Sequence, residues 1–405
     1  MGCLDIIMEV GIVGKPSSGK STFFKGATLA EVEISSRPFT TIKPNHAVGF
    51  VKVECVDKEF NKQCNPRFGY CLQGWRFVPV DLLDVAGLVP GAHKGLGKGN
   101  QFLDDLRQAD VLIHVVDVSG SINEKGEAVE AGSYDPAKDI EFLEFELDMW
   151  YLGILKKGWE KFARQVQQEG REIDKALGKQ LSALKVTEEM AKEVINFLGL
   201  NKEKPGEWTE DELMKLAIEF RKKTKPTIIA CNKIDVKGAE ENFLRLEKKF
   251  PDRMMIRCSA EVELALREAA KGGLIKYIPG EGDFEIIDEN KLDESKKKGL
   301  EFMKKFMEKF SGTGVQGVLD KAVFDFLKYF AVFPGGVNKL EDQHGNVLPD
   351  CFLMPPGSTA LDFAYQIHTD IGDKFIRAIN VKTKMTIGKE HKLKNRDVVE
   401  IVTRK

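Results

Sequence analysis

The chain has 405 residues, of which 42% are hydrophobic and 31% are charged, and its formal net charge is −2. This composition is that of a folded globular protein and excludes a disordered, collagen-like or fibrous chain. A length of this order predicts roughly two to four domains. Because the chain as a whole is nearly neutral, any contact with nucleic acid must come from a local basic patch.

Hydropathy and cysteine content predict where the protein works. No run approaches the ~18 apolar residues of a membrane span, so we expect no membrane association. The first residues, Met1-Gly-Cys-Leu-Asp, lack the basic region and the cleavage site of a secretory signal. Seven cysteines are too few for a disulfide scaffold and fit a reducing compartment. We therefore expect a cytoplasmic protein.

Short β-branched runs alternate with helical stretches in much of the chain. Buried strands are predicted at 8–14, 77–83, 111–116 and 227–230, and a helix at 100–108. Such alternation predicts an α/β fold with βαβ units and a mostly parallel sheet covered on both faces. Residues 135–222 are rich in Glu, Lys, Gln and Leu at helical spacing, which predicts an inserted helical hairpin, solvated and without a site of its own.

The last third of the chain changes character. A helical stretch is predicted from about 290 to 330, after a cluster of glycines and a proline. The residues that follow become β-rich, with short strands predicted at 347–354, 376–381 and 398–402. This change indicates a small separate domain at the end of the chain.

The segment Gly14-Lys15-Pro16-Ser17-Ser18-Gly19-Lys20-Ser21 fits the pattern G-x-x-x-x-G-K-[ST], after a predicted strand and before a helix that can open at Thr22. In this pattern backbone N–H groups point at phosphate oxygens, and the helix N-terminus adds partial positive charge. Lys20 would reach the β- and γ-phosphates, and the Ser21 hydroxyl would bind Mg²⁺. We interpret the segment as a phosphate loop; a chance glycine-lysine loop is the alternative.

Three further motifs predict which nucleotide is bound. Asp84-Val-Ala-Gly87 ends a predicted strand, so that Asp84 can hold Mg²⁺ and the Gly87 N–H can sense the γ-phosphate. Asn232-Lys233-Ile234-Asp235 follows another strand, and the Asp235 carboxylate can accept two hydrogen bonds from guanine, a donor pair that adenine lacks. In Cys258-Ser259-Ala260 the backbone N–H groups can reach the guanine O6. The ordered set predicts GTP and GDP binding with Mg²⁺.

These motifs resemble those of the translation-factor class of P-loop GTPases, and their finer detail resembles the YchF-like branch of the Obg family. Phe39-Thr40-Thr41-Ile42-Lys43-Pro44-Asn45 is similar to that family's switch I, and the glycine-rich segment 84–103 to its extended switch II. The run 354–368, Met-Pro-Pro-Gly-Ser-Thr-Ala-Leu-Asp-Phe-Ala-Tyr-Gln-Ile-His, resembles the signature of a TGS domain. The helical insertion carries the weakest part of the resemblance.

The resemblance implies an organisation in four parts. These are a GTPase domain at 1–134 and 223–275, the helical insertion at 135–222, a helical connector at 276–330 and a β-grasp TGS domain at 331–405. It also implies a nucleotide-dependent switch that acts on the ribosome or on RNA, as a monomer. Two other classes stay open: a nucleotide kinase, which would need neither a threonine switch nor a guanine motif, and a binding scaffold whose hydrolysis is incidental.

The resemblance also assigns catalytic roles. Lys20 would stabilise the phosphates, and Thr41, with Thr40 as second choice, would close on Mg²⁺. Leu88 stands where related enzymes carry a glutamine that orients water, and leucine has no donor or acceptor. Hydrolysis should therefore be slow. His93 is the nearest imidazole, either a water-positioning residue or merely a loop histidine.

Three other positions bear on nucleotide choice and catalysis. YchF proteins typically carry Glu where this chain has Asp235, and they accept ATP, so we expect GTP and keep an ATP-accepting enzyme as the alternative. Ser17 replaces the asparagine that binds potassium in related loops, which leaves potassium dependence open. His114 lies inside an apolar strand and is interpreted as a core residue.

Cys55, Cys64 and Cys71 fall within one short segment. Three thiolates could bind Zn²⁺ with a fourth ligand such as Cys3, but the spacing lacks the paired C-x-x-C of common zinc modules. We favour reduced structural cysteines, and the predicted metal is Mg²⁺ alone.

The end of the chain is locally basic. Residues 374–405 hold ten Lys or Arg against three acidic residues, a local excess of +7. Lys382, Lys384, Lys392 and Lys394 are candidates for phosphate contacts with RNA; a solvated basic edge is the alternative. Ser358 or Thr359 should cap a helix over 360–367 whose Leu361, Ala364 and Tyr365 side packs on the sheet.

Overall fold

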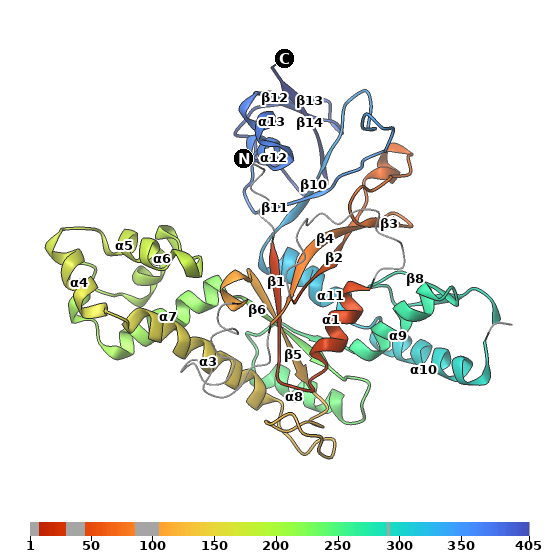
Figure 1. Cartoon of the computed structure of the whole chain (residues 1–405), viewed down its shortest axis with the longest axis horizontal. Coiled ribbons are helices and arrows are strands. Elements are labelled where there is room, and N and C mark those ends of the chain that lie inside the picture. Colours follow the sequence, from red (N-terminus) through yellow and green to blue (C-terminus); the bar gives the residue numbers. More distant parts are fainter. Residues whose placement is uncertain (1–7, 30–44, 86–104, 290–291, 405) are drawn as a thin grey trace. The chain divides into compact units, whose positions relative to one another are not determined.

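The computed structural model describes residues 8–29, 45–85, 105–289 and 292–404 (Figure 1). The chain divides into two compact units. The first comprises Met1–Met8, Ser21–Leu82 and Cys258–Lys405, and the second comprises Glu9–Lys20 and Leu83–Arg257. This division crosses the four segments expected from the sequence, whose boundaries remain a prediction.

The second unit is built on parallel strands. β1 (Glu9–Val13), β5 (Val111–Asp117), β6 (Thr227–Asn232) and β7 (Met255–Arg257) pair in that order, and every pair is parallel. All residues of β5 are buried, as a parallel sheet covered on both faces requires. The strands predicted at 8–14, 111–116 and 227–230 are confirmed. Because parallel strands point the same way, the loops after β1, β5 and β6 leave the same edge of the sheet.

The helical insertion has more helices than one hairpin. It consists of α3 (Ala137–Lys156), α4 (Trp159–Gln168), α5 (Ile173–Gln180), α6 (Glu188–Leu198) and α7 (Glu210–Thr224). The long helices α3 and α7 pack on each other as the two arms of a hairpin would. Gly158 and Gly199 adopt positive φ at helix ends and break the chain between these arms into shorter helices. The expectation of a simple hairpin is therefore wrong in this detail.

Aromatic side chains form the core of the insertion. Trp150, Tyr151, Trp159 and Phe220 are buried in one cluster with leucines from the same helices. Helix α7 begins at a capping box, in which Thr209 and Glu212 satisfy each other's backbone N–H groups. After β6 the chain continues into α8 (Ala239–Lys249).

The first unit contains an antiparallel hairpin and several helices. β2 (His46–Glu54) neighbours β4 (Trp75–Asp84), whose last two residues belong to the second unit, and β3 (Tyr70–Leu72) pairs with β4. The strand predicted at 77–83 is thus confirmed within β4. α1 (Lys20–Thr28) begins at the last residue of the second unit's first segment and continues into this unit. α9 (Ala260–Lys271) is followed by the small hairpin of β8 (Ile275–Tyr277) and β9 (Phe284–Ile286).

The helical stretch expected from about 290 to 330 is interrupted. α10 (Glu294–Phe310) ends where Ser311 adopts a φ of 56°, and Gly312 and Gly314 also have positive φ. α11 (Val315–Asp320) then begins and leads into a π-helical turn at Lys321–Phe326. A Ser-Gly-Thr-Gly sequence ends a helix because glycine adopts the left-handed conformation without steric cost.

The C-terminal strands form one mixed sheet (Figure 1, blue). Its order is β11 (Phe352–Met354), β10 (Phe330–Pro334), β14 (Asp397–Thr403), β12 (Phe375–Asn380) and β13 (Met385–Ile387). β10 and β14 are parallel, and the other neighbours are antiparallel. The strands predicted at 376–381 and 398–402 are confirmed, the one at 347–354 is shorter, and β10 was not predicted.

Helix α12 (Ala360–Ile367) begins where it was predicted. Thr359 forms a capping box with Asp362. The buried face is made by Ala360, Phe363 and Ala364. The expectation that Tyr365 packs on the sheet is wrong: Tyr365 is 42% exposed, and its hydroxyl donates to Asp373. Positions 360, 363, 364 and 367 form one helical face, and position 365 lies outside it.

Two expectations concern segments at the limits of the described chain. Of the helix predicted at 100–108, residues 105–108 are helical and the rest lies outside the described residues. Among the helices in the described ranges, none combines the length and the apolar character needed to cross a bilayer.

Candidate functional site

The phosphate loop leaves β1 and enters α1 with glycines at its two tightest points. A Cβ at Gly14 would lie 2.6 Å from the carbonyl oxygen of Val115, and a Cβ at Gly19 would lie 2.1 Å from the side-chain nitrogen of Asn232. Gly19 also has a φ of +92°. The Ser18 hydroxyl is buried and has no hydrogen-bond partner in the described part of the chain. The close backbone packing at Gly14 and Gly19, together with the unpaired hydroxyl of Ser18, suits a loop that binds an anion through main-chain N–H groups.

The two charged residues predicted to address phosphate and Mg²⁺ lie together. The Lys20 ammonium contacts a carboxylate oxygen of Asp84, with both side chains partly buried. Asp84 ends β4, and the N–H of the next residue, Val85, donates to the carbonyl of Ile12 in β1 at 3.1 Å. A carboxylate oxygen is the ligand type that Mg²⁺ prefers, so these residues fit the predicted ion. Ser21 is the second residue of α1 and is exposed.

A buried amide joins the phosphate loop to the predicted guanine motif. The Asn232 side chain, at the end of β6, donates a 2.9 Å hydrogen bond to the carbonyl of Ser18. Asp235, three residues further on, is exposed and makes no hydrogen bond or ion pair with another described residue. Its carboxylate is therefore available to accept hydrogen bonds from a base.

Asp117 holds Lys233, the second residue of the guanine motif. This role was not predicted from the sequence. The Lys233 ammonium lies 2.9 Å from Asp117, which is fully buried at the end of β5. The backbone N–H of Ser119 and the hydroxyl of Ser121 also donate to this carboxylate, at 3.0 and 2.9 Å. The position of Asp117, directly after an apolar strand at the ligand-binding edge of a parallel sheet, was the signal that could have found it.

The Lys15 side chain is buried against the segment that follows β5 and the start of α3. Its ammonium lies 2.8 Å from the Asp139 carboxylate, donates to the carbonyl of Ile122 at 2.8 Å and sits 3.8 Å above the Tyr134 ring. Burial raises the pKa of Asp139, and the Lys15 charge opposes this rise. Lys15 can therefore serve a phosphate only through its backbone, while its side chain anchors the loop.

A second contact fixes the exposed side of the loop. The Ser17 hydroxyl donates to the carbonyl of Gly126 at 3.0 Å, and a Cβ at Gly126 would lie 2.8 Å from the Pro16 side chain. The segment after β5 therefore packs closely on the phosphate loop. Ser17 takes a φ of +61°, a conformation that the hydrogen bond helps to hold.

His114 is a core residue, as expected. It is buried in β5, and burial lowers the pKa of its imidazole to about 3. The ring is therefore neutral at physiological pH and takes no part in proton transfer there.

Several predicted site residues are not joined to this site by the structure. Thr41, Gly87 and His93, together with Thr40 and Leu88, lie outside the described residues. Ser259 and Ala260 belong to the first unit, where the Ser259 hydroxyl caps α9 by accepting from the N–H of Val262. Their contacts with a base remain a prediction.

The basic end of the chain is partly neutralised. Lys382 forms an ion pair with Glu59 at 2.7 Å, and Arg396 lies 2.7 Å from Glu54 and also contacts Glu59. Lys382 therefore has a partner within the fold, and its contact with RNA remains a prediction. Lys384, Lys392 and Lys394 are exposed and form no ion pair with another described residue.

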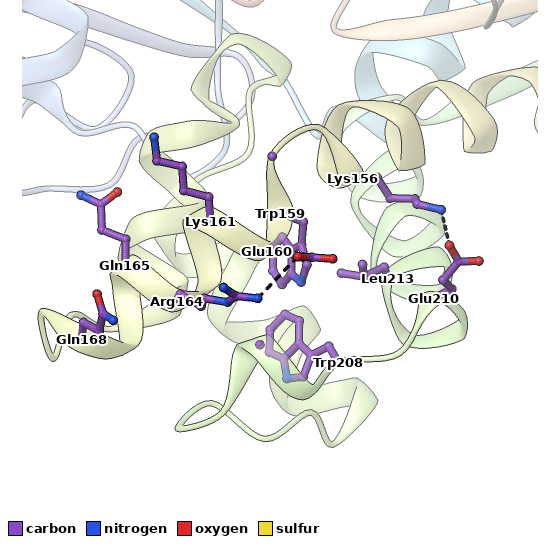
Figure 2. A pocket seen from close by; sticks show the side chains of 12 residues that line it. Lys156, Trp159, Glu160, Lys161, Arg164, Gln165, Gln168, Trp208, Glu210 and Leu213 are labelled. Carbon is purple, nitrogen blue, oxygen red and sulfur yellow. Dashed lines mark hydrogen bonds and ion pairs between the residues drawn. The ribbon is translucent and has the colours of Figure 1, made fainter.

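A hollow of about 880 Å³ lies on the helical insertion (Figure 2). The indoles of Trp159 and Trp208 stack at its centre, with ring centroids 5.4 Å apart. Lys156 pairs with Glu210, and Arg164 with Glu160, at its rim (Figure 2). No residue of the phosphate loop lines it, so it is separate from the candidate nucleotide site.

The fold and the site define a P-loop nucleotide-binding protein. Three family models match successive parts of the chain. They are a 50S ribosome-binding GTPase model at residues 9–143, the G4-motif-containing domain of YGR210-like Obg-like GTPases at 230–336, and the TGS domain at 343–403.

Relatives match nearly the whole chain. The chain is 49% identical over 395 residues to a protein of Methanocaldococcus jannaschii named as an uncharacterized GTP-binding protein. The match covers 97% of this chain and 98% of that protein. A ribosome-binding ATPase YchF of Haemophilus influenzae is 28% identical and covers 91% of this chain and 87% of its own. Among solved structures, that of a GTP-binding protein from Pyrococcus horikoshii matches with a TM-score of 0.76 and 38% sequence identity. The match covers 98% of this chain and 100% of that one. The chain therefore belongs to the Obg-like GTPase family, in its YchF-like branch, with a C-terminal TGS domain.

Proposed function

We propose that this protein binds GTP and GDP with Mg²⁺ and hydrolyses GTP slowly, as a nucleotide-dependent switch on the ribosome or on RNA. The observation that carries the proposal is the 2.9 Å hydrogen bond from Asn232 to Ser18. It fixes the guanine motif against the phosphate loop, while Asp235 stays exposed. One ligand with both a guanine base and a polyphosphate satisfies this arrangement.

Each part of the ligand has a counterpart in the chain. The loop from Gly14 to Ser21 would surround the phosphates with backbone N–H groups, and Lys20 would offset the charge of the β- and γ-phosphates. Mg²⁺, held by Ser21, Asp84 and Thr41, would neutralise further negative charge between these phosphates. Gly87 would report the γ-phosphate. The contact between Lys20 and Asp84 supports a shared place for these two roles.

Slow hydrolysis follows from the residue at position 88. Leu88 cannot donate or accept a hydrogen bond, so it cannot orient the attacking water. Without such a group, turnover should be of the order of an unassisted GTPase, roughly 10⁻⁴ to 10⁻² per second. We propose that His93 positions the attacking water. A binding partner would raise the rate of hydrolysis.

The ribosome or an RNA is the proposed partner. A family model for ribosome-binding GTPases matches residues 9–143, and similar proteins are named ribosome-binding ATPases. The TGS domain carries exposed Lys384, Lys392 and Lys394, which suit phosphate contacts. We further propose that the protein acts in the cytoplasm as a monomer.

ATP is the second candidate nucleotide, because relatives such as the Haemophilus influenzae protein are named ATPases. A competition assay with fluorescent GDP decides between the two. We expect GTP to displace the probe at far lower concentration than ATP, and Asp235→Asn to shift preference towards xanthine nucleotides. Equal displacement of the probe by ATP and GTP would contradict selectivity for guanine and would favour an ATP-accepting enzyme.

Variants of the loop test the rest of the site. Lys20→Ala should lose nucleotide binding, and Ser21→Ala should lose the Mg²⁺-dependent part of the affinity. His93→Ala should lower the hydrolysis rate and leave binding intact; an unchanged rate removes His93 from the proposal. Hydrolysis that ribosomes fail to stimulate, with association equal in GDP and a GTP analogue, would favour a scaffold with incidental turnover.

A further inference from the structure

Three cysteines and one aspartate, none of them part of a nucleotide motif, converge in the first unit. Cys55 follows β2, Asp57 begins the 3₁₀ helix η1 (Asp57–Phe60), Cys64 lies in the loop that follows, and Cys71 is in β3. The three sulfur atoms and a carboxylate oxygen of Asp57 all lie within 4.8 Å of one another. Residues separated in sequence are thus brought to one point by the chain between β2 and β4.

The spacing of these atoms is close to that around a tetrahedral metal. The Cys55 and Cys64 sulfurs are 3.6 Å apart, and the Cys71 sulfur is 4.0 Å from the Asp57 carboxylate. With Zn–S bonds of about 2.3 Å, two sulfurs on one tetrahedral zinc are separated by about 3.8 Å. Small side-chain rotations would therefore place the four atoms at bonding distance from one ion.

Asp57 gives an independent indication of a cation. Asp57 is only 1% exposed, and its carboxylate accepts hydrogen bonds from the backbone N–H groups of Lys58 and Cys64, at 2.8 and 3.2 Å. In the described ranges no Lys, Arg or His forms an ion pair with it. Buried carboxylates are normally paired with a cation or bound to a metal. A carboxylate enclosed by three thiols, without a basic partner, is what a metal site would require.

We propose that Cys55, Asp57, Cys64 and Cys71 bind one Zn²⁺ as a closed, structural site. Thiolate ligands select zinc over the hard cations Mg²⁺ and Ca²⁺, and four protein ligands leave no position for a reacting water. On binding, each thiol gives its proton to solvent and its sulfur forms one bond to zinc. Nothing is oxidised or reduced. The site is independent of the nucleotide proposed above.

The metal would fix a segment that meets the TGS domain. The backbone N–H groups of Asn65 and Arg67, between the second and third cysteines, donate to the carbonyls of Val347 and Pro349, both at 2.8 Å. These contacts lie within the first unit. Zinc would therefore hold the loop in the conformation that presents these donors, and its loss would loosen the contact with residues 347–349.

Metal analysis of the full-length protein tests the proposal. Protein purified with a thiol reductant and then dialysed against zinc-free buffer should retain about one zinc per chain. Cys64→Ser, Cys71→Ser and Asp57→Asn should each weaken zinc binding by more than about tenfold. Cys231→Ala, which removes a thiol from β6, is the matched control and should retain zinc.

Cobalt titration keeps the test decisive if a variant fails to fold. After zinc is removed from the parent protein, Co²⁺ should give thiolate-to-cobalt charge-transfer bands and the visible bands of a tetrahedral site. Bound metal should also protect Cys55, Cys64 and Cys71 from alkylation, and protease cleavage at 55–74 should increase on chelation and decrease when zinc is restored.

Several results would overturn the assignment. They are a zinc content of the parent protein no higher than that of the cysteine variants, no thiolate band with cobalt, or a Cys55–Cys64 disulfide in the protein as isolated. Cys351, half-buried and close enough to Cys55 and Cys64 to interact electrostatically with them, also carries a thiol. Zinc lost from Cys351→Ser but kept by Asp57→Asn would show a four-cysteine site and refute the ligand set proposed here.

Discussion

Lys15, inside the phosphate loop, forms a buried ion pair of 2.8 Å with Asp139, the third residue of α3. The pair joins the phosphate loop to the first helix of the insertion. Both side chains are more than nine-tenths buried. Their mutual attraction is therefore little screened, and each needs the other to offset the cost of burial.

Removal of one member of this pair should be more harmful than removal of both. Lys15→Ala leaves the Asp139 carboxylate buried without its cation, and we expect a loss of about 3–5 kcal/mol in the free energy of unfolding. Lys15→Met combined with Asp139→Leu should recover much of this loss, because neither charge then remains. Urea denaturation measures both variants.

The exposed pair between Lys249 and Glu141 provides the control. Its ammonium and carboxylate are 2.7 Å apart, but the side chains are about half exposed. Lys249→Ala should cost at most about 1 kcal/mol. Similar losses for Lys15→Ala and Lys249→Ala would contradict a buried, unscreened pair.

Asn232 should affect nucleotide affinity without reading the base. Asn232→Ala removes the donor to Ser18 and leaves that buried carbonyl unsatisfied, at a cost of about 1–3 kcal/mol. We expect GDP affinity to fall by about tenfold or more, while the preference for GDP over ADP persists through Asp235. Titration calorimetry with both nucleotides measures this, and loss of preference with unchanged GDP affinity would reverse the assigned roles.

The nucleotide motifs could be predicted because their chemistry depends on local sequence. Gly19 and Asn232 were both found, but their contact depends on the sheet, which places the ends of β1 and β6 at one edge. The Lys15 anchor could not be found in this way, since Asp139 lies more than 100 residues away and carries no motif. Pairing of Lys382 with Glu59 was missed for the same reason.

Local breakers explain the errors in secondary structure. Helical spacing at 135–222 was recognised, but the number of helices depended on Gly158 and Gly199 at helix ends. The four residues proposed as zinc ligands illustrate the opposite case, in which local sequence was misleading. Their irregular spacing argued against a metal, whereas the folded loop brings Asp57 among the thiols.

Asp320 should make stability depend on pH. Burial raises the pKa of this carboxyl from 3.8 to about 7, against the opposing charges of Lys52 and Arg267. Its carboxylate oxygen accepts from the N–H of Lys52 and from the Gln316 side chain, at 2.8 and 2.9 Å. Between these pKa values the folded state binds more protons than the unfolded state, so stability falls as pH rises and becomes constant above about pH 7.

Asp320→Asn keeps the accepting oxygen and removes the ionisation. Relative to the parent, this variant should gain up to about 1.4 kcal/mol in unfolding free energy for each pH unit between pH 5 and 7. Urea denaturation at several pH values gives the comparison, with Asp325→Asn, an exposed carboxyl that pairs with Lys321, as the control. Parallel profiles for Asp320→Asn and the parent would rule out this source of pH dependence.

Arg76 should hold the TGS segment on β4. Its buried guanidinium donates to the carbonyls of Leu348 and Pro349, at 3.0 and 2.7 Å. Arg76→Met removes two charge-assisted hydrogen bonds and should cost about 3 kcal/mol. Hydrogen exchange should increase at 347–349. Arg67→Ala breaks the half-exposed pairs with Asp342 and Asp350 and should cost about 1 kcal/mol or less; equal effects would show that Arg76 does not hold this segment.

Three lysines of the TGS domain should carry its RNA or ribosome contacts. Lys384, Lys392 and Lys394 are exposed, whereas Lys382 is engaged by Glu59. Replacement of the three by Gln should weaken association and, since each phosphate contact contributes about 0.7–0.9, reduce the log–log salt slope by about 2–3. Co-sedimentation with ribosomes at several salt concentrations measures both quantities.

A charge-matched control separates local contacts from total charge. Lys157, Lys179 and Lys192 are exposed on the helical insertion, and their replacement by Gln removes the same three charges. We expect this variant to associate as the parent does, because only charges near bound phosphates release counterions. Lys382→Gln should leave the salt slope unchanged, since its ion pair already holds the ammonium within the fold. Equal weakening by the TGS and insertion variants would show that net charge, and not the TGS surface, governs association.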